Sequence, residues 1–85
     1  MPELPGQVIR ERSFERQLRV LIQDAREADD FVEGAEFLLA RDPEIGVPLG
    51  EGIWFLPMAP IGKAQPALYY TFDDSTVTFL AIPSV

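Results

Sequence analysis

The chain has 85 residues, 47% of them hydrophobic, which is enough for one domain with a single core but too little for two. Acidic residues outnumber basic ones 14 to 7, and the resulting net charge of −7 repels polyanions, so nucleic acid is an unfavourable partner. Cysteine and histidine are both absent, which excludes disulfides, thiolate metal sites and histidine-based catalysis.

Membrane insertion and secretion are also not indicated. No apolar run approaches the ~20 residues of a membrane-spanning helix, and the acidic N-terminal region lacks the basic and apolar segments of a secretory signal. We therefore expect a cytoplasmic protein with no membrane partner. Because the usual metal ligands are missing, we also expect neither a metal site nor a cofactor.

The N-terminal half is predicted to be helical. Residues 1–6 contain two prolines and a glycine and indicate a loose lead, and residues 7–12 fit a short edge strand. From Ser13, which suits an N-cap, apolar residues recur at helical spacing. Asp24 and Glu27 resemble a capping box, so the region holds either two helices or one bent helix. The two apolar stripes consist of Phe14, Leu18, Leu21, Ile22 and Ala25, and of Ala28, Phe31, Val32, Ala35, Leu38 and Leu39.

The C-terminal half is predicted to be a sheet. Pro43 ends the helical pattern, and the glycines and prolines of residues 46–52 indicate a turn-rich connection where the chain changes direction. Residues rich in aromatic and β-branched types then predict strands over 53–58, 67–72 and 76–82, the last two joined by a tight turn at residues 73–75. The fold class is therefore α+β, a single domain over 1–85 with two N-terminal helices packed on a small antiparallel sheet of three to four strands.

The predicted strands are apolar on both faces. One layer of helices covers only one face of a sheet, and the opposite face of an antiparallel sheet is usually polar where it meets water. The surplus apolar surface favours a bound partner or a homodimer, the alternative being that the chain's own ends and loops cover it. The side chains that we assign to partner binding are Trp54, Leu56, Met58 and Tyr69.

Charged residues suggest few other sites. Asp73 and Asp74 are a candidate pair for metal or acid–base chemistry, but aspartate in such a place typically stabilises a turn. Five arginines in the first third of the chain indicate either a solvated helix face or a patch for phosphate or an acidic partner. These arginines are Arg10, Arg12, Arg16, Arg19 and Arg26.

The order of elements and the closing hairpin carry a family resemblance. A helical hairpin precedes Ala40-Arg41-Asp42-Pro43 and Gly46-Val47-Pro48-Leu49, and three strands follow. Over Tyr69–Ile82 an aromatic strand turns through acidic residues into a Val-x-x-Leu-Ala-Ile strand. In this order, and above all in this last hairpin, the chain resembles the RelE/ParE toxin superfamily over residues 14–82.

The resemblance implies the toxin half of a bacterial toxin–antitoxin pair, with a partner chain wrapped around the domain. The RelE branch cleaves messenger RNA on the ribosome with basic residues, and often a tyrosine, from its late strands. Here the only cation after Arg41 is Lys63, and no arginine accompanies Tyr69 and Tyr70, so the charge stabilisation that phosphoryl transfer requires is missing. Lys63 and Tyr70 are the only catalytic candidates that this likeness leaves.

The ParE branch, which acts by binding DNA gyrase, needs no such catalytic set. We therefore expect a toxin-like protein-binding module rather than an enzyme, with an antitoxin-like partner and a gyrase-like target. One alternative is a ribosome-dependent endoribonuclease of the RelE type. The other is a homodimeric adaptor or structural protein without toxicity.

Overall fold

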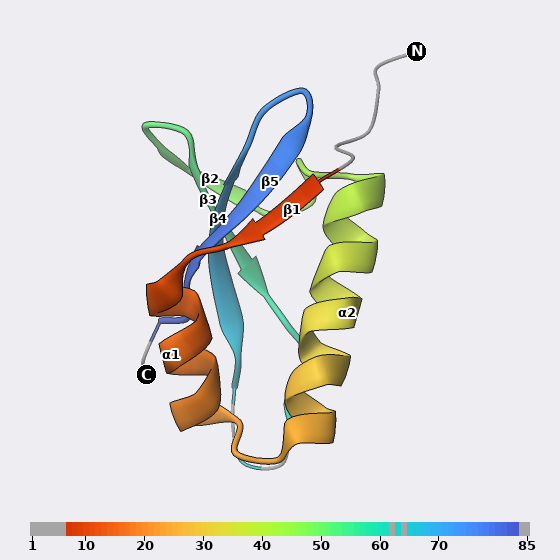
Figure 1. Cartoon of the computed structure of the whole chain (residues 1–85). Helices are drawn as coiled ribbons and strands as arrows, with labels where there is room; N and C mark the ends of the chain where they lie inside the picture. The colour runs from red at the N-terminus through yellow and green to blue at the C-terminus, as the bar shows by residue number, and fades with distance from the viewer. Residues whose placement is uncertain (1–6, 62, 64, 84–85) are drawn as a thin grey trace.

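The computed structural model describes residues 7–61, 63 and 65–83. The predicted lead at residues 1–6, and two residues beside Lys63, lie outside that range. Two helices and five strands follow one another along the chain (Figure 1). They are β1 (Gln7–Arg10), α1 (Arg12–Leu21), α2 (Ala25–Arg41), β2 (Val47–Gly50), β3 (Ile53–Pro57), β4 (Ala67–Phe72) and β5 (Thr76–Ala81).

The sheet is larger than predicted and is mixed. Its strand order is β1-β5-β4-β3-β2, with β1 parallel to β5 and every other pair antiparallel. The α+β class with two helices is confirmed, but a wholly antiparallel sheet of three to four strands is wrong. The extra strand is β2, which forms from Val47–Gly50 where the glycines and prolines indicated only a connection.

The start of α1 also differs from the prediction. The helix begins at Arg12 after an N-cap at Glu11, whose side chain makes no capping hydrogen bond. The backbone N–H of Glu11 still donates to Phe79 of β5 at 3.0 Å, so the chain passes from β1 directly into the helix. Ser13 therefore does not cap α1, and its hydroxyl donates instead to the carbonyl of Leu80 at 2.7 Å.

A short break separates the two helices. Asp24 caps α2 as expected, because its carboxylate accepts the backbone N–H of Glu27 at 3.0 Å. Figure 1 shows the helices running in opposite directions on one side of the sheet. The structure thus has two helices rather than one bent helix. None of the helices in the described residues is long and apolar enough to cross a membrane.

The core lies between the two helices and one face of the sheet. Phe14 of α1 packs edge-on against Phe79 of β5, with ring centroids 5.3 Å apart, and stacks with Phe31 of α2 at 6.5 Å. The predicted stripes supply most of the helical side of the core, although Ala25 is exposed. The buried cluster comprises Phe14, Leu18, Ile22, Phe31, Val32, Ala35, Leu39, Leu56, Leu68, Tyr70, Val77, Phe79 and Ile82.

The turn between β4 and β5 is built by Asp73. One carboxylate oxygen of Asp73 accepts the backbone N–H groups of Ser75 at 2.9 Å and Thr76 at 2.8 Å. These hydrogen bonds favour the ionised carboxylate and hold the pKa of Asp73 below its ordinary value. The turn function that the sequence indicated for Asp73 is therefore confirmed.

Candidate functional site

The sheet face that points away from the helices is the strongest candidate site. Because directly paired residues share a face, the strand register assigns every second side chain to it. The strand positions that face this way in the described residues carry no charged side chain. We call this surface the open face and define it by its apolar members, Ile9, Val47, Leu49, Ile53, Phe55, Tyr69, Leu80 and Ala81.

Exposure distinguishes the open face from the core. Val47 and Leu49 of β2 are 54% and 56% exposed, and Ile9 of β1 is 43% exposed. In the middle of the face, Phe55 and Tyr69 form an aromatic pair with ring centroids 5.6 Å apart. Aromatic side chains of this kind supply large, rigid contact area at protein interfaces.

A β-bulge in β5 shapes a shallow hollow on the open face. Tyr69 pairs with Ala81 but Tyr70 pairs with Phe79, so Leu80 is an extra residue in β5. Leu80 and Ala81 consequently both line the hollow, while Ile82 returns to the core. The hollow measures about 350 Å³ and is walled by Leu49, Ile53, Tyr69, Leu80 and Ala81.

Polar side chains of α1 hold the bulge in place. The Ser13 hydroxyl bonds the Leu80 carbonyl at 2.7 Å, and the backbone N–H of Ile82 donates to the side-chain oxygen of Gln17 at 2.7 Å. These two contacts continue the edge of β5 beyond the end of β1. Since backbone groups left without partners favour unwanted strand pairing, α1 both covers the core and closes this edge.

The other edge of the sheet is poorly suited to pairing with a further strand. β2 has four residues and includes Pro48, which has no backbone N–H to donate. Short strands and proline are common devices against edge-to-edge association. A partner of this domain is therefore better accommodated over the open face than along the β2 edge.

The residues predicted to bind a partner divide between the two faces of the sheet. Leu56 is 6% exposed and belongs to the core, and Trp54 and Met58 are half-buried against the same core. Trp54 lies 5.3 Å from the Phe72 ring and 6.3 Å from the Tyr70 ring, between centroids. Only Tyr69 lies on the open face.

Several open-face residues were not among the predicted site residues, namely Val47, Leu49, Ile53, Phe55 and Leu80. The alternation of Ile53 and Phe55 with Trp54 and Leu56 was visible in the sequence. Because both sets are apolar, however, the alternation did not show which set the helices cover.

The two catalytic candidates do not come together. Tyr70 is fully buried, and its hydroxyl donates to the carbonyl of Pro43 at 2.6 Å and accepts the N–H of Gly46 at 3.2 Å. Lys63 is exposed in the loop between β3 and β4. That loop follows the Pro57–Ala67 pair at one end of the β3–β4 pairing, whereas Tyr70 pairs with Trp54 at the other end and contacts the segment after α2.

The environment of Tyr70 is that of a structural hydroxyl. Burial raises the pKa of Tyr70, the carboxylates of Asp42 and Glu44 raise it further, and the Gly46 N–H opposes them. The phenol therefore stays protonated at neutral pH and acts as a hydrogen-bond donor. Its two hydrogen bonds fasten the segment between α2 and β2 to the middle of the sheet.

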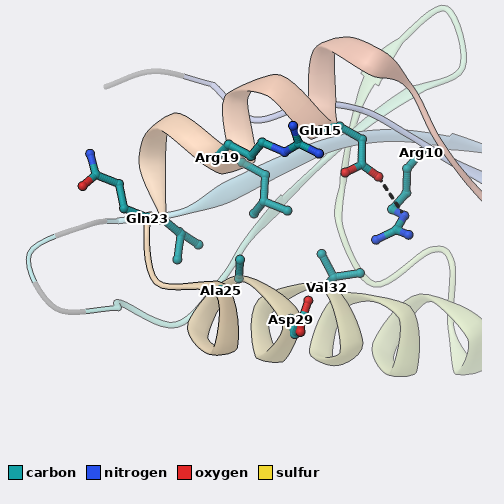
Figure 2. A pocket seen from close by; sticks show the side chains of 10 residues that line it. Arg10, Glu15, Arg19, Gln23, Ala25, Asp29 and Val32 are labelled. Atoms are coloured by element: carbon teal, nitrogen blue, oxygen red, sulfur yellow. Dashed lines mark ion pairs between the residues drawn. The ribbon is translucent and has the colours of Figure 1, made fainter.

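A second, more polar groove of about 280 Å³ lies between α1 and α2 (Figure 2). Arg10 and Glu15 form an ion pair at 3.1 Å at one end, and Arg19 and Asp29 line the groove from the two helices. The ion pair is over a third exposed on both sides, so it contributes little to stability. In the residues that the structure describes, no cluster of acidic side chains could hold a metal ion.

Searches against protein-family models, curated proteins and solved structures gave no significant match.

Proposed function

We propose that this chain is the toxin-like member of a bacterial type II toxin–antitoxin pair, that it is cytoplasmic, and that it acts through protein–protein contacts. The observation that carries the proposal is the open face, which has no charged side chain at its described strand positions and exposes apolar side chains beside Thr71, Thr76 and Thr78. Exposed apolar side chains that gather around a hollow, as Leu49, Ile53, Tyr69, Leu80 and Ala81 do, are typical of an interaction site. The resemblance of residues 14–82 to the RelE/ParE superfamily supplies the class of partner, an antitoxin-like chain.

The charge of the domain favours a different chain over a second copy on the open face. Each copy carries a net charge of −7, so two copies packed face to face repel each other at low ionic strength. An antitoxin-like chain with apolar side chains for the hollow and basic residues at its margin avoids this repulsion. A gyrase-like target, as in the ParE branch, would engage the domain once that partner leaves.

The position of Tyr70 argues against the endoribonuclease alternative. Its hydroxyl is buried and holds two backbone groups, so it is not available to activate a ribose hydroxyl. Lys63 lies in a loop at the other end of the sheet, and a lone ammonium there does not provide the charge stabilisation that phosphoryl transfer needs. Binding alone therefore fits the described residues better than catalysis.

The experiment is induced expression in a bacterial host, alone and together with the product of the neighbouring reading frame. The proposal predicts growth inhibition by the chain alone and relief when both are expressed, with the two chains co-purifying. Leu49→Asp should abolish co-purification, because it introduces a charge beside the hollow. Phe37→Asp is the matched control, since Phe37 on α2 is 59% exposed against 56% for Leu49.

Three results would contradict the proposal. The first is normal growth together with a stable dimer of the chain alone, which would favour the homodimeric adaptor. The second is an equal loss of co-purification in both variants, which would place the interface elsewhere. The third is cleavage of messenger RNA that is lost in Lys63→Ala, which would restore the endoribonuclease.

A further inference from the structure

The outward side of α1 concentrates positive charge in an otherwise acidic domain. Arg12, Arg16 and Arg19 are all exposed and follow one another at spacings of four and three residues, which places them on one side of the helix. Together with Val20 and Glu15 they line a single shallow depression in the surface, and the Glu15 carboxylate there is paired with Arg10. We call these three residues the arginine stripe.

Helix stability does not explain Arg12 and Arg16 of the arginine stripe. Like charges three and four residues apart repel each other, and a cation at Arg12, the first residue of α1, opposes the helix dipole, whereas Arg19 in the last turn favours it. Within the described part of the chain, the ion pair that forms nearby joins Glu15 to Arg10 and involves no member of the stripe. Arg12 and Arg16 thus carry charge that no ion pair with the described residues neutralises.

An apolar groove adjoins the arginine stripe. It measures about 360 Å³ and lies between α1 and the segment that follows β5. Val20, which is 72% exposed, and Leu21 form one wall, and Ile82 and Pro83 form the other. Arg16 belongs both to the groove and to the stripe, so the cationic and apolar surfaces are continuous.

The floor of this groove is fixed by a hydrogen bond. The side-chain oxygen of Gln17 accepts the backbone N–H of Ile82 at 2.7 Å, which ties the segment after β5 to α1. Ile82 is 3% exposed and anchored in the core. A groove held in this way loses little conformational entropy when something binds in it.

We propose that the arginine stripe and the adjoining groove form a docking site for a short acidic segment of another protein. An apolar side chain of that segment enters the groove between Val20 and Pro83, and its carboxylates bind Arg12 and Arg16 through charge-assisted hydrogen bonds. The argument is charge complementarity, because this surface attracts acidic groups while the rest of the domain repels them. It uses residues outside the open face and does not depend on the proposed function.

A peptide suits this surface better than a nucleic acid. The groove is apolar and takes a hydrocarbon side chain, for which a phosphate backbone has no counterpart. A long polyanion would also extend beyond the stripe into the field of a domain whose net charge is −7.

The test is a titration of the full chain, labelled for NMR, with a short capped peptide that carries glutamate and leucine at helical spacing. Peptides with glutamine in place of glutamate, and with serine in place of leucine, are the controls. We expect shifts confined to α1 and to Ile82, and at least roughly tenfold weaker binding of either control peptide.

Two charge reversals make the test specific. Arg16→Glu should weaken binding of the acidic peptide by roughly tenfold or more, whereas Arg26→Glu on α2, with the same change in net charge, should leave it unchanged. Both side chains are exposed, and amide spectra of the free variants verify the fold.

The proposal is overturned if no shifts appear at α1, if the glutamine peptide binds equally well, or if Arg26→Glu weakens binding as much as Arg16→Glu. Tighter binding of a single-stranded RNA oligonucleotide than of the peptide at the same residues would also overturn it, by assigning the stripe to nucleic acid.

Discussion

Replacing Tyr70 by phenylalanine tests whether its hydroxyl serves structure or chemistry. The substitution keeps the buried ring but leaves the Pro43 carbonyl and the Gly46 N–H without their partner. A net hydrogen bond contributes about 1 kcal/mol, so the loss of two should lower the free energy of unfolding by about 2 kcal/mol. For a domain of this size that corresponds to a fall in Tm of roughly 10 °C.

The measurement is thermal unfolding followed by circular dichroism, with Tyr69→Phe as the control. Tyr69 is half-buried on the open face, and its hydroxyl makes no hydrogen bond with the described residues, so the same chemical change should stay within about 0.5 kcal/mol of the wild type. An unchanged Tm in Tyr70→Phe would refute the structural assignment. A loss of growth inhibition without a loss of stability would instead make Tyr70 a catalytic residue.

The structure also predicts how three further substitutions change the stability of the fold. Gly34→Ala should raise the free energy of unfolding by about 0.5–1 kcal/mol, because alanine favours the interior of α2 and the new Cβ would meet the Met58 methyl at 3.9 Å, an ordinary van der Waals contact. A lower Tm would contradict this. Gly46→Ala should destabilise the fold, because the new Cβ would lie 2.6 Å from the Phe55 carbonyl oxygen and 2.7 Å from the Tyr70 hydroxyl. We expect denaturant titration to show a loss of about 1–3 kcal/mol in the free energy of unfolding. An unchanged free energy would show that the segment after α2 can move. The pKa of Asp73 is lower in the folded chain than in the unfolded one. The ionised carboxylate therefore stabilises the fold fully above about pH 4, and this stabilisation is lost as the pH falls through the pKa of the folded state. Stability measured against pH should therefore fall less steeply on the acid side in Asp73→Ala, and identical curves would show that the turn is not coupled to this carboxylate.

The helices could be predicted because their signals were local. Phe14, Leu18 and Ile22 recur at helical spacing, and Asp24 marks a start that its own side chain then caps. The start of α1 could not be predicted in the same way. Ser13 resembles a cap in sequence, but its hydroxyl is taken by Leu80, 67 residues later in the chain.

The strand β2 was missed because its residues indicate a turn. Pro48 and Gly50 are unfavourable in the middle of a sheet, yet both are tolerated at an edge strand next to a bulge. Gly50, which ends β2 and pairs with Ile53, and Gly52 in the turn have φ angles of 104° and 80°, which favour glycine at both positions. The glycines and prolines therefore predicted the turn correctly but did not indicate the strand β2, which leads into it.

The location of the candidate site could be predicted only in part. Apolar residues on both faces of the strands indicated correctly that one face would remain without helices. The bulge at Leu80 changes which side chains of β5 face the core, and a bulge of this kind has no local sequence signal. The choice of Trp54, Leu56 and Met58 consequently fell on the face that the helices cover.

The most direct test of the proposed partner surface is a comparison of amide and methyl NMR spectra of the chain alone and in complex with the co-expressed product of the neighbouring reading frame. The open face predicts the largest changes at Phe55, Tyr69 and Leu80, with the outer side of α2 around Phe37 unaffected. Changes confined to α2, or identical spectra with and without the partner, would contradict the assignment of the open face as the binding surface.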